Sequence, residues 1–259
     1  MKKLMITAAA ALCATAAAYA EGVESGIVGY QENTSNSGNG YTMMCPNFLG
    51  VGSETGCKLS DLSVTGYSGM SMGAFVLRPL TATGTAESGP YYWVDIPAQS
   101  KKGWFLNAAG TSQIPGGASS VTFTAGRALW CQGKGLKLVP AGMVNESLVS
   151  FTSNGGNGYT AMGNCTPVDL TLDKLTVSGY SGMSLGAFVL RPLTPTGTAE
   201  SGPYYWVDVP AQSKCGWFLN AAGTSQIPGG ASSVTITAGR GLWCQGKGLT
   251  LNIPAPVLN

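Results

Sequence analysis

The chain contains no histidine among its 259 residues. Histidine is the usual base beside a Ser or Cys nucleophile and the commonest side-chain ligand of transition metals. Its absence excludes those catalytic arrangements and most metal sites. We therefore expect a protein that is not an enzyme, with no catalytic residue, no metal site and no cofactor.

Charged residues are also scarce, at 10% of the chain, and the formal net charge is only +2. Phosphate recognition needs a stripe of Lys and Arg, which the sequence lacks, so nucleic acid is not an expected partner. Beyond the first 20 residues no apolar run is long enough to span a bilayer, which takes about 20 residues. The partners that stay open are another copy of the chain and glycans.

The first 20 residues have the composition of an export signal. Lys2 and Lys3 precede an apolar, alanine-rich run over 4–18, and Ala18-Tyr19-Ala20 follows it. This order is typical of a secretory signal cleaved after Ala20. The sequence thus predicts a secreted protein, extracellular or at the cell surface.

Glycine is abundant, with 38 residues, and short alternating segments lie between the glycine-rich turns. In Val121-Thr122-Phe123-Thr124 the apolar residues occupy one face of a half-buried strand. No segment of the exported part has a sustained helical period, although 59–62 is compatible with one helical turn. In the first half of the chain we expect strands at 26–31, 40–47, 73–80, 91–96, 103–107, 120–124, 128–132 and 136–139.

The chain repeats itself. Residues 64–138 match 177–251 without a gap at an offset of 113, and they differ at eight of 75 positions. Further upstream, 38–42 matches 156–160 at an offset of 118, and 27–30 parallels 148–151. The sequence predicts a signal peptide (1–20) and two tandem β-sandwich-like or small-barrel domains of about 115 residues each (21–143 and 144–259).

Similarity within each copy is uneven, because the first 35 or so residues have diverged while the rest have not. One explanation is gene conversion restricted to the later part, which we favour slightly. The other is that the early strands of the two copies have acquired different neighbours.

An aromatic cluster recurs in both copies. Exposed aromatic side chains dominate binding hot spots, so the part of this cluster that faces solvent is a candidate ligand platform. A strand has a period of two, and therefore at least half of the cluster has to lie in the core. The candidate platform consists of Tyr91, Tyr92, Trp93, Trp104, Tyr204, Tyr205, Trp206 and Trp217.

Two pairs of matched acids, Glu87/Glu200 and Asp95/Asp208, are the remaining candidates for catalysis. A glycosidase holds two carboxylates roughly 5–10 Å apart. The sequence favours a plainer interpretation, in which one acid is solvated in a loop and the other caps a turn at a strand end.

Six cysteines follow the signal segment, and export permits disulfides. Cys131 and Cys244 are equivalent, and Cys45 and Cys165 occupy the same early strand one or two positions out of step. Bridges Cys45–Cys131 and Cys165–Cys244 would use that equivalence, although six cysteines allow 15 pairings. The unmatched Cys57 and Cys215 are expected to pair across the domains, pair between chains or stay free.

Several short motifs recur in a fixed order: an early strand at 25–31, a Gly-Tyr-x-Met strand at 40–43, the Tyr-Tyr-Trp segment, and the endings Ala-Gly-Arg-Ala-Leu-Trp at 125–130 and Ala-Gly-Arg-Gly-Leu-Trp at 238–243. This layout resembles that of secreted tandem-repeat β-domain proteins from planctomycete–verrucomicrobial type bacteria. The resemblance implies secretion, a β-domain and an extracellular or surface role, and it transfers no catalytic residue.

Together these observations predict a secreted, non-enzymatic structural or adhesive protein built from duplicated β-domains. One alternative is a pair of carbohydrate-binding modules that use aromatic faces, with two weak sites combined by avidity. Another is an extracellular filament subunit in which the strand at 25–31 completes a neighbour's sheet.

Overall fold

A computed structural model describes residues 28–51, 53, 55–81, 87–194 and 200–256. The predicted signal peptide lies outside the described residues. The protein is all-β, as the sequence predicts, and the only helices of the described residues are six short 3-10 turns, η1–η6. No sheet of the described residues closes into a barrel, which decides the architecture in favour of a sandwich-like packing. Among the same residues no helix is long and apolar enough to cross a membrane.

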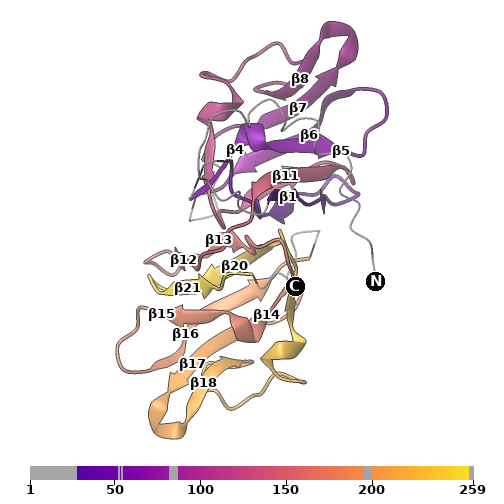
Figure 1. Ribbon diagram of the computed structural model, residues 1–259. Helices are drawn as coiled ribbons and strands as arrows, with labels where there is room; N and C mark the ends of the chain where they lie inside the picture. Colours follow the sequence, from indigo (N-terminus) through magenta and orange to yellow (C-terminus); the bar gives the residue numbers. More distant parts are fainter. Residues whose placement is uncertain (1–27, 52, 54, 82–86, 195–199, 257–259) are drawn as a thin grey trace.

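Copy 1 forms the upper lobe in Figure 1, where two sheets pack over a core. One sheet has four strands, in which β11 (Lys137–Met143) pairs with β1 (Val28–Tyr30), β2 (Asn33–Thr34) and β5 (Leu62–Thr65). The other has the order β3-β10-β6-β7-β8, formed by Thr42–Met44, Leu129–Gln132, Ser71–Pro79, Tyr91–Ile96 and Lys101–Phe105. A small third sheet pairs β4 (Gly56–Lys58) with β9 (Thr122–Thr124), and the 3-10 turns are η1 (Leu59–Asp61), η2 (Pro97–Gln99) and η3 (Ala118–Ser120).

Copy 2 forms the lower lobe with the same plan. Its small sheets pair β21 (Thr250–Ile253) with β12 (Val149–Thr152) and β15 (Thr176–Ser178), and β14 (Leu170–Thr171) with β19 (Thr235–Ile236). Its five-stranded sheet has the order β13-β20-β16-β17-β18, formed by Thr160–Gly163, Gly241–Gln245, Ser184–Pro192, Tyr204–Val209 and Lys214–Phe218. The 3-10 turns are η4 (Leu172–Lys174), η5 (Pro210–Gln212) and η6 (Ala231–Ser233).

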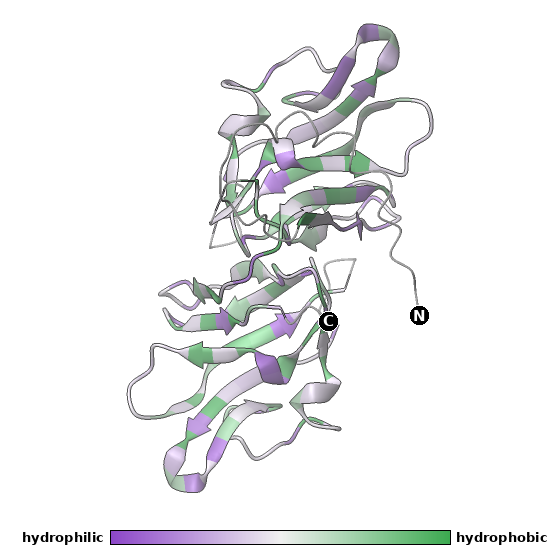
Figure 2. Ribbon diagram, viewed as in Figure 1, coloured by the Kyte–Doolittle hydropathy of each residue, from purple (hydrophilic) through white to green (hydrophobic). Residues whose placement is uncertain are grey.

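Each five-stranded sheet has an inner face, which covers the core of its copy, and an outer face on the other side. In copy 1 the inner face carries Phe75, Trp93 and Trp104, all 6% exposed or less. The Trp93 and Trp104 rings meet edge to face at 5.3 Å, and Trp104 Nε1 donates a 2.7 Å hydrogen bond to the Leu62 carbonyl. The indoles therefore fill the core while their only polar group stays bonded. Figure 2 shows the complementary pattern at the outer tips, where the β7–β8 and β17–β18 hairpins are hydrophilic.

All eight expected strands of copy 1 overlap an observed strand, and β7 has the expected bounds. The helical turn expected at 59–62 is η1. The alignment of 27–30 in copy 1 with 148–151 in copy 2 is wrong by three residues. The structural equivalent of Phe151 is Asn33, because Asn33 lies opposite Leu138 as Phe151 lies opposite Leu251. The strand β1 is thus an addition before the repeat, and it pairs with residues 141–143 of its own chain.

The two copies join through equivalent backbone hydrogen bonds. The Cys45 amide donates to the Gly239 carbonyl at 2.8 Å, and the Gly163 amide donates to the Gly126 carbonyl at 3.0 Å. Cys45 and Gly163 are equivalent at the offset of 118, as Gly126 and Gly239 are at 113. The copies therefore meet like an isologous dimer, with the same surface of each copy at the contact and a pseudo-two-fold axis between them.

Side chains at this contact are complementary in size. A Cβ on Gly163 would lie 2.4 Å from the Cβ of Cys45, its own equivalent across the pseudo-two-fold axis. A Cβ on Gly241 would lie 2.3 Å from the Cγ of Met43. Real Cβ atoms do not approach other atoms so closely, so neither position of copy 2 has room for a side chain. Cys45 and Met43 of copy 1 therefore each face a glycine of copy 2.

The equivalents of Met43 and Gly241 are Ala161 and Ala128, and both alanines belong to the buried cluster at the junction. One side of the junction therefore pairs Met with Gly, while the equivalent side provides two alanines. The substitution Ala128/Gly241, one of the eight differences between the repeats, has a packing reason.

Gly241→Ala is expected to lower the free energy of unfolding by roughly 1–3 kcal/mol, because it overpacks the contact with Met43. In a Met43→Ala background the same substitution is expected to be neutral or stabilising, because it rebuilds an alanine pair of the Ala128–Ala161 kind. Urea unfolding of the four proteins of this double-mutant cycle measures both effects. Ala128→Gly serves as the control, with an expected cost below about 1 kcal/mol. Equal effects of Gly241→Ala in both backgrounds would contradict the packing interpretation.

Candidate functional site

Six of the eight residues of the candidate aromatic platform are buried, more than the half that strand alternation requires, so these six do not form an exposed platform. Trp104 and Trp217 are only 5% and 4% exposed. Period-two alternation identifies which residues share a face, and the structure shows that the face of Tyr91 and Trp93 is the inner one. The buried members are Tyr91, Trp93, Trp104, Tyr204, Trp206 and Trp217, which leaves Tyr92 and Tyr205 half-buried on the outer faces.

Another set of aromatic side chains reaches solvent at the junction of the copies. Tyr41 lies 5.9 Å from Trp130, Trp130 lies 6.4 Å from Trp243, and Trp243 lies 6.0 Å from Tyr159, measured between ring centroids. Both tyrosines are about 40% exposed (39% and 41%), and both tryptophans are partly exposed. We call these four residues the aromatic row.

The row follows from strand register and from the pseudo-two-fold contact. Trp130 lies on the outer face of β10, opposite Met43 of β3. Trp243 lies opposite Ala161 in the same way. Both indoles pack against the buried junction cluster, which also includes Leu80 and Leu193. The row therefore stands on an apolar base that both copies build.

An arginine flanks each tryptophan of the row. Arg78 of β6 is the cross-strand neighbour of Trp130, and Arg191 of β16 is the neighbour of Trp243. Cross-strand neighbours project from the same face with their Cβ atoms about 5 Å apart. Within the described part of the chain, the buried Nε of each arginine has no hydrogen-bond partner. The row thus combines ring surfaces with two guanidinium groups, neither of which is in an ion pair among the described residues.

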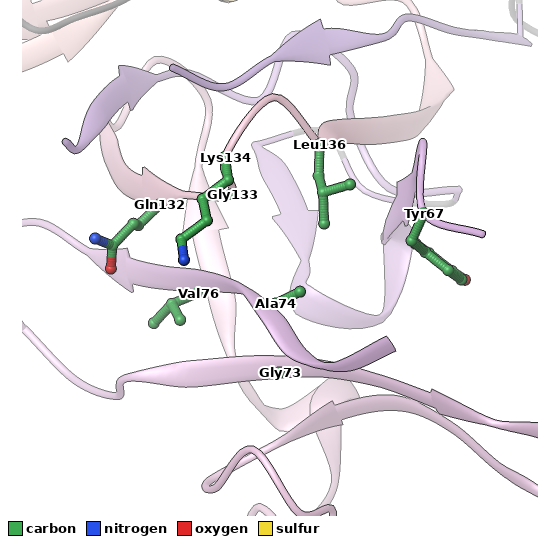
Figure 3. A pocket seen from close by; sticks show the side chains of 8 residues that line it. All are labelled: Tyr67, Gly73, Ala74, Val76, Gln132, Gly133, Lys134 and Leu136. Atoms are coloured by element: carbon green, nitrogen blue, oxygen red, sulfur yellow. The ribbon is translucent and has the colours of Figure 1, made fainter. Parts of the chain in front are cut away.

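A hollow of about 330 Å³ adjoins this outer face in copy 1 (Figure 3). Gln132 and Lys134 lie beside it, facing Val76 and Ala74 of β6. The Gln132 side-chain amide donates to the Asn39 carbonyl, two residues before Tyr41. The hollow therefore lies on the same face of the sheet as Trp130, two residues farther along β10.

The matched acids are held in separate surroundings. Asp95 accepts a 2.7 Å hydrogen bond from the hydroxyl of Tyr67 and lies 3.4 Å from Lys102 Nζ. Burial raises the pKa of Tyr67, and the hydrogen bond that its hydroxyl donates to Asp95 acts in the same direction. The hydrogen bond that Trp93 Nε1 donates to the phenolic oxygen lowers this pKa, but the net shift is upward. Glu87 instead lines a cavity of about 180 Å³ with Arg127. No described contact joins Asp95 and Glu87, and the arrangement of Asp95 ties a loop to the sheet.

The predicted disulfides Cys45–Cys131 and Cys165–Cys244 are not formed, because all six cysteines described are free thiols. Cys45 belongs to the core cluster of copy 2, while Cys131 lies opposite Thr42 in the core of copy 1. The two side chains therefore belong to different cores. The described residues also contain no group of Cys and carboxylate side chains that could hold a metal ion.

The unmatched cysteines are far from equivalent. Cys57 is buried in the core of copy 1, and burial, followed by the nearby Asp61, raises its pKa to about 12. Cys215 is exposed on β18, where the copy 1 counterpart is Lys102. Burial and the neighbouring Asp208 raise the pKa of Cys215 above its ordinary value.

In the native protein without reductant, only Cys215 is expected to react with a thiol reagent such as Ellman's reagent, and six thiols after residue 20 are expected to react in denaturant. Since a raised pKa lowers the thiolate fraction at a given pH, its reaction rate should rise at higher pH than that of a cysteine peptide. Asp208→Asn should move this profile back toward lower pH. Fewer than six reactive thiols after unfolding would show disulfides and contradict the structure.

Comparison with known proteins adds no relative from which a role can be transferred: no protein-family model, curated protein or solved structure matches the chain. The resemblance to secreted tandem-repeat β-domain proteins therefore stays a prediction, and the aromatic row is the feature from which function has to be inferred.

Proposed function

We propose that the chain is a non-enzymatic, extracellular adhesive protein that holds a glycan chain along the aromatic row. The observation that carries the proposal is the row itself, in which Trp130 and Trp243 of different copies lie 6.4 Å apart on a solvent-facing surface. The predicted export signal supports an extracellular setting, and the missing histidine supports binding without catalysis.

Glycans suit this surface because a sugar ring has apolar C–H faces and a polar rim. Aromatic rings take the apolar faces, and nearby hydrogen-bonding side chains take the hydroxyl groups. Gln132 and Gln245 are half-buried on the outer faces, in strands β10 and β20 of the tryptophans. The row thus provides both kinds of contact that a sugar chain requires.

The orientation of the rings restricts which form of glycan can contact all of them. Successive rings of the row are inclined by 68°, 61° and 68°, so they do not form one flat wall. A flat crystalline surface would touch only some of the rings. A single flexible chain can turn from one ring to the next, and we propose that form of glycan.

The junction also changes the expected number of sites. Tandem modules would provide two weak sites joined by avidity. Here the two tryptophans are in direct ring contact, and the copies share backbone hydrogen bonds. We therefore propose one composite site for each chain.

Trp130→Ala and Trp243→Ala are each expected to weaken glycan binding roughly tenfold or more, because each removes a central ring of one shared site. Tyr41→Ala and Tyr159→Ala, at the exposed ends, should give smaller losses without disturbing the junction. A glycan array identifies the ligand, and titration calorimetry gives affinity and a stoichiometry of one.

Tyr92→Ala and Tyr205→Ala are the matched controls, since both tyrosines are half-buried on the outer faces but outside the row. They should bind like the unchanged protein. Two equal sites that survive one at a time in the tryptophan variants would contradict the composite site. Absence of binding to any glycan would overturn the proposed function.

A further inference from the structure

Arginine is distributed unevenly over the molecule. The chain has four arginines, and all of them lie in or beside the strands at the junction. Arg127 and Arg240 bridge to Met162 and Met44 of the other copy, while Arg78 and Arg191 flank the tryptophans. The ion pairs among the described residues involve lysine alone. Of these four, Arg78 and Arg191 are the cross-strand neighbours of the tryptophans in the aromatic row.

Arg127 and Arg240 have acidic neighbours. Burial lowers the pKa of Arg240, and the nearby Glu200 acts in the opposite direction by raising it. Arg127 and Glu87 line the same cavity in copy 1. These two arginines are thus balanced by charges of their own chain.

Arg78 and Arg191 lack such a balance within the described residues. Neither is in an ion pair there, and the buried Nε of each is without an acceptor. Because the Nε atoms are buried, the terminal NH2 groups of these half-buried side chains are the donors that face a ligand, and a carboxylate is their best acceptor because it can take two parallel N–H bonds. Two equivalent arginines are therefore placed to donate hydrogen bonds to acidic groups on either side of the tryptophan pair.

We propose that the glycan held by the aromatic row is acidic, a chain that contains uronic acid, and that Arg78 and Arg191 bind its carboxylates. This inference rests on the proposed function. The rings pack against the sugar faces, and each guanidinium receives a carboxylate from a sugar unit next to Trp130 or Trp243. Lysine would not replace arginine fully, because an ammonium group lacks the planar pair of donors.

Oligogalacturonides and their fully methyl-esterified forms provide a matched test, since they share one backbone and differ in charge. The unchanged protein is expected to bind the free acid about tenfold or more tighter than the ester at low salt, as charge-assisted hydrogen bonds imply. In Arg78→Gln/Arg191→Gln this preference should fall to about one while ester binding is retained, and Arg78→Lys/Arg191→Lys should lie between. Circular dichroism and thermal unfolding establish that the variants are folded.

Lys58→Gln/Lys174→Gln is the charge control, because it removes two positive charges from exposed positions away from the row. It should keep the full preference for the acid. Equal binding of acid and ester by the unchanged protein would overturn the inference and leave the proposed function standing. Binding of sulfated chains in place of uronic acids would overturn the carboxylate assignment. Loss of all glycan binding, ester included, would overturn both proposals.

Discussion

The arrangement of the molecule depends on a close approach of two equivalent backbone segments. Cys45 and Gly163 donate equivalent hydrogen bonds across the pseudo-two-fold axis, and the near contact between them leaves room for one side chain only. This contact aligns the edges of the two five-stranded sheets and places Trp130 against Trp243. A flexible linker alone would leave the two outer faces unrelated, because relative motion is the default for domains that share little surface.

The same constraint explains part of the divergence between the early segments of the two copies. Near-identical halves bring identical residues together close to a two-fold axis, and two large side chains cannot occupy the same place. Met43 and Cys45 in copy 1 face Gly241 and Gly163 in copy 2. The early strands β3 and β13 carry these differences, so the diverged region has different neighbours in the two copies. Local packing therefore accounts for part of the divergence that gene conversion alone would leave unexplained.

The fold was largely predictable from local signals, whereas the site was not. Alternation and turn glycines identify β7 and the other long strands, but two- and three-residue strands such as β2 and β4 are too short to show a period. Alternation also leaves open which face is the inner one, and hence the platform residues Trp104 and Trp217 were expected in the wrong place. The aromatic row joins Tyr41 to Tyr159 through partners about a hundred residues apart, which only the tertiary contact determines.

The symmetry of the row has a consequence for recognition. Tyr, Trp, Trp and Tyr follow one another, with Arg78 and Arg191 at equivalent places, so the order of groups is the same from either end. The asymmetric pair Met43 and Gly241 belongs to the packing beneath and beside the rings. A sugar chain has a direction, but a surface of this kind offers both directions the same rings and the same cations. A regular chain with one acidic group per unit fits such a surface better than a branched glycan with a single distinctive end, because the repeat of the ligand then matches the repeat of the protein.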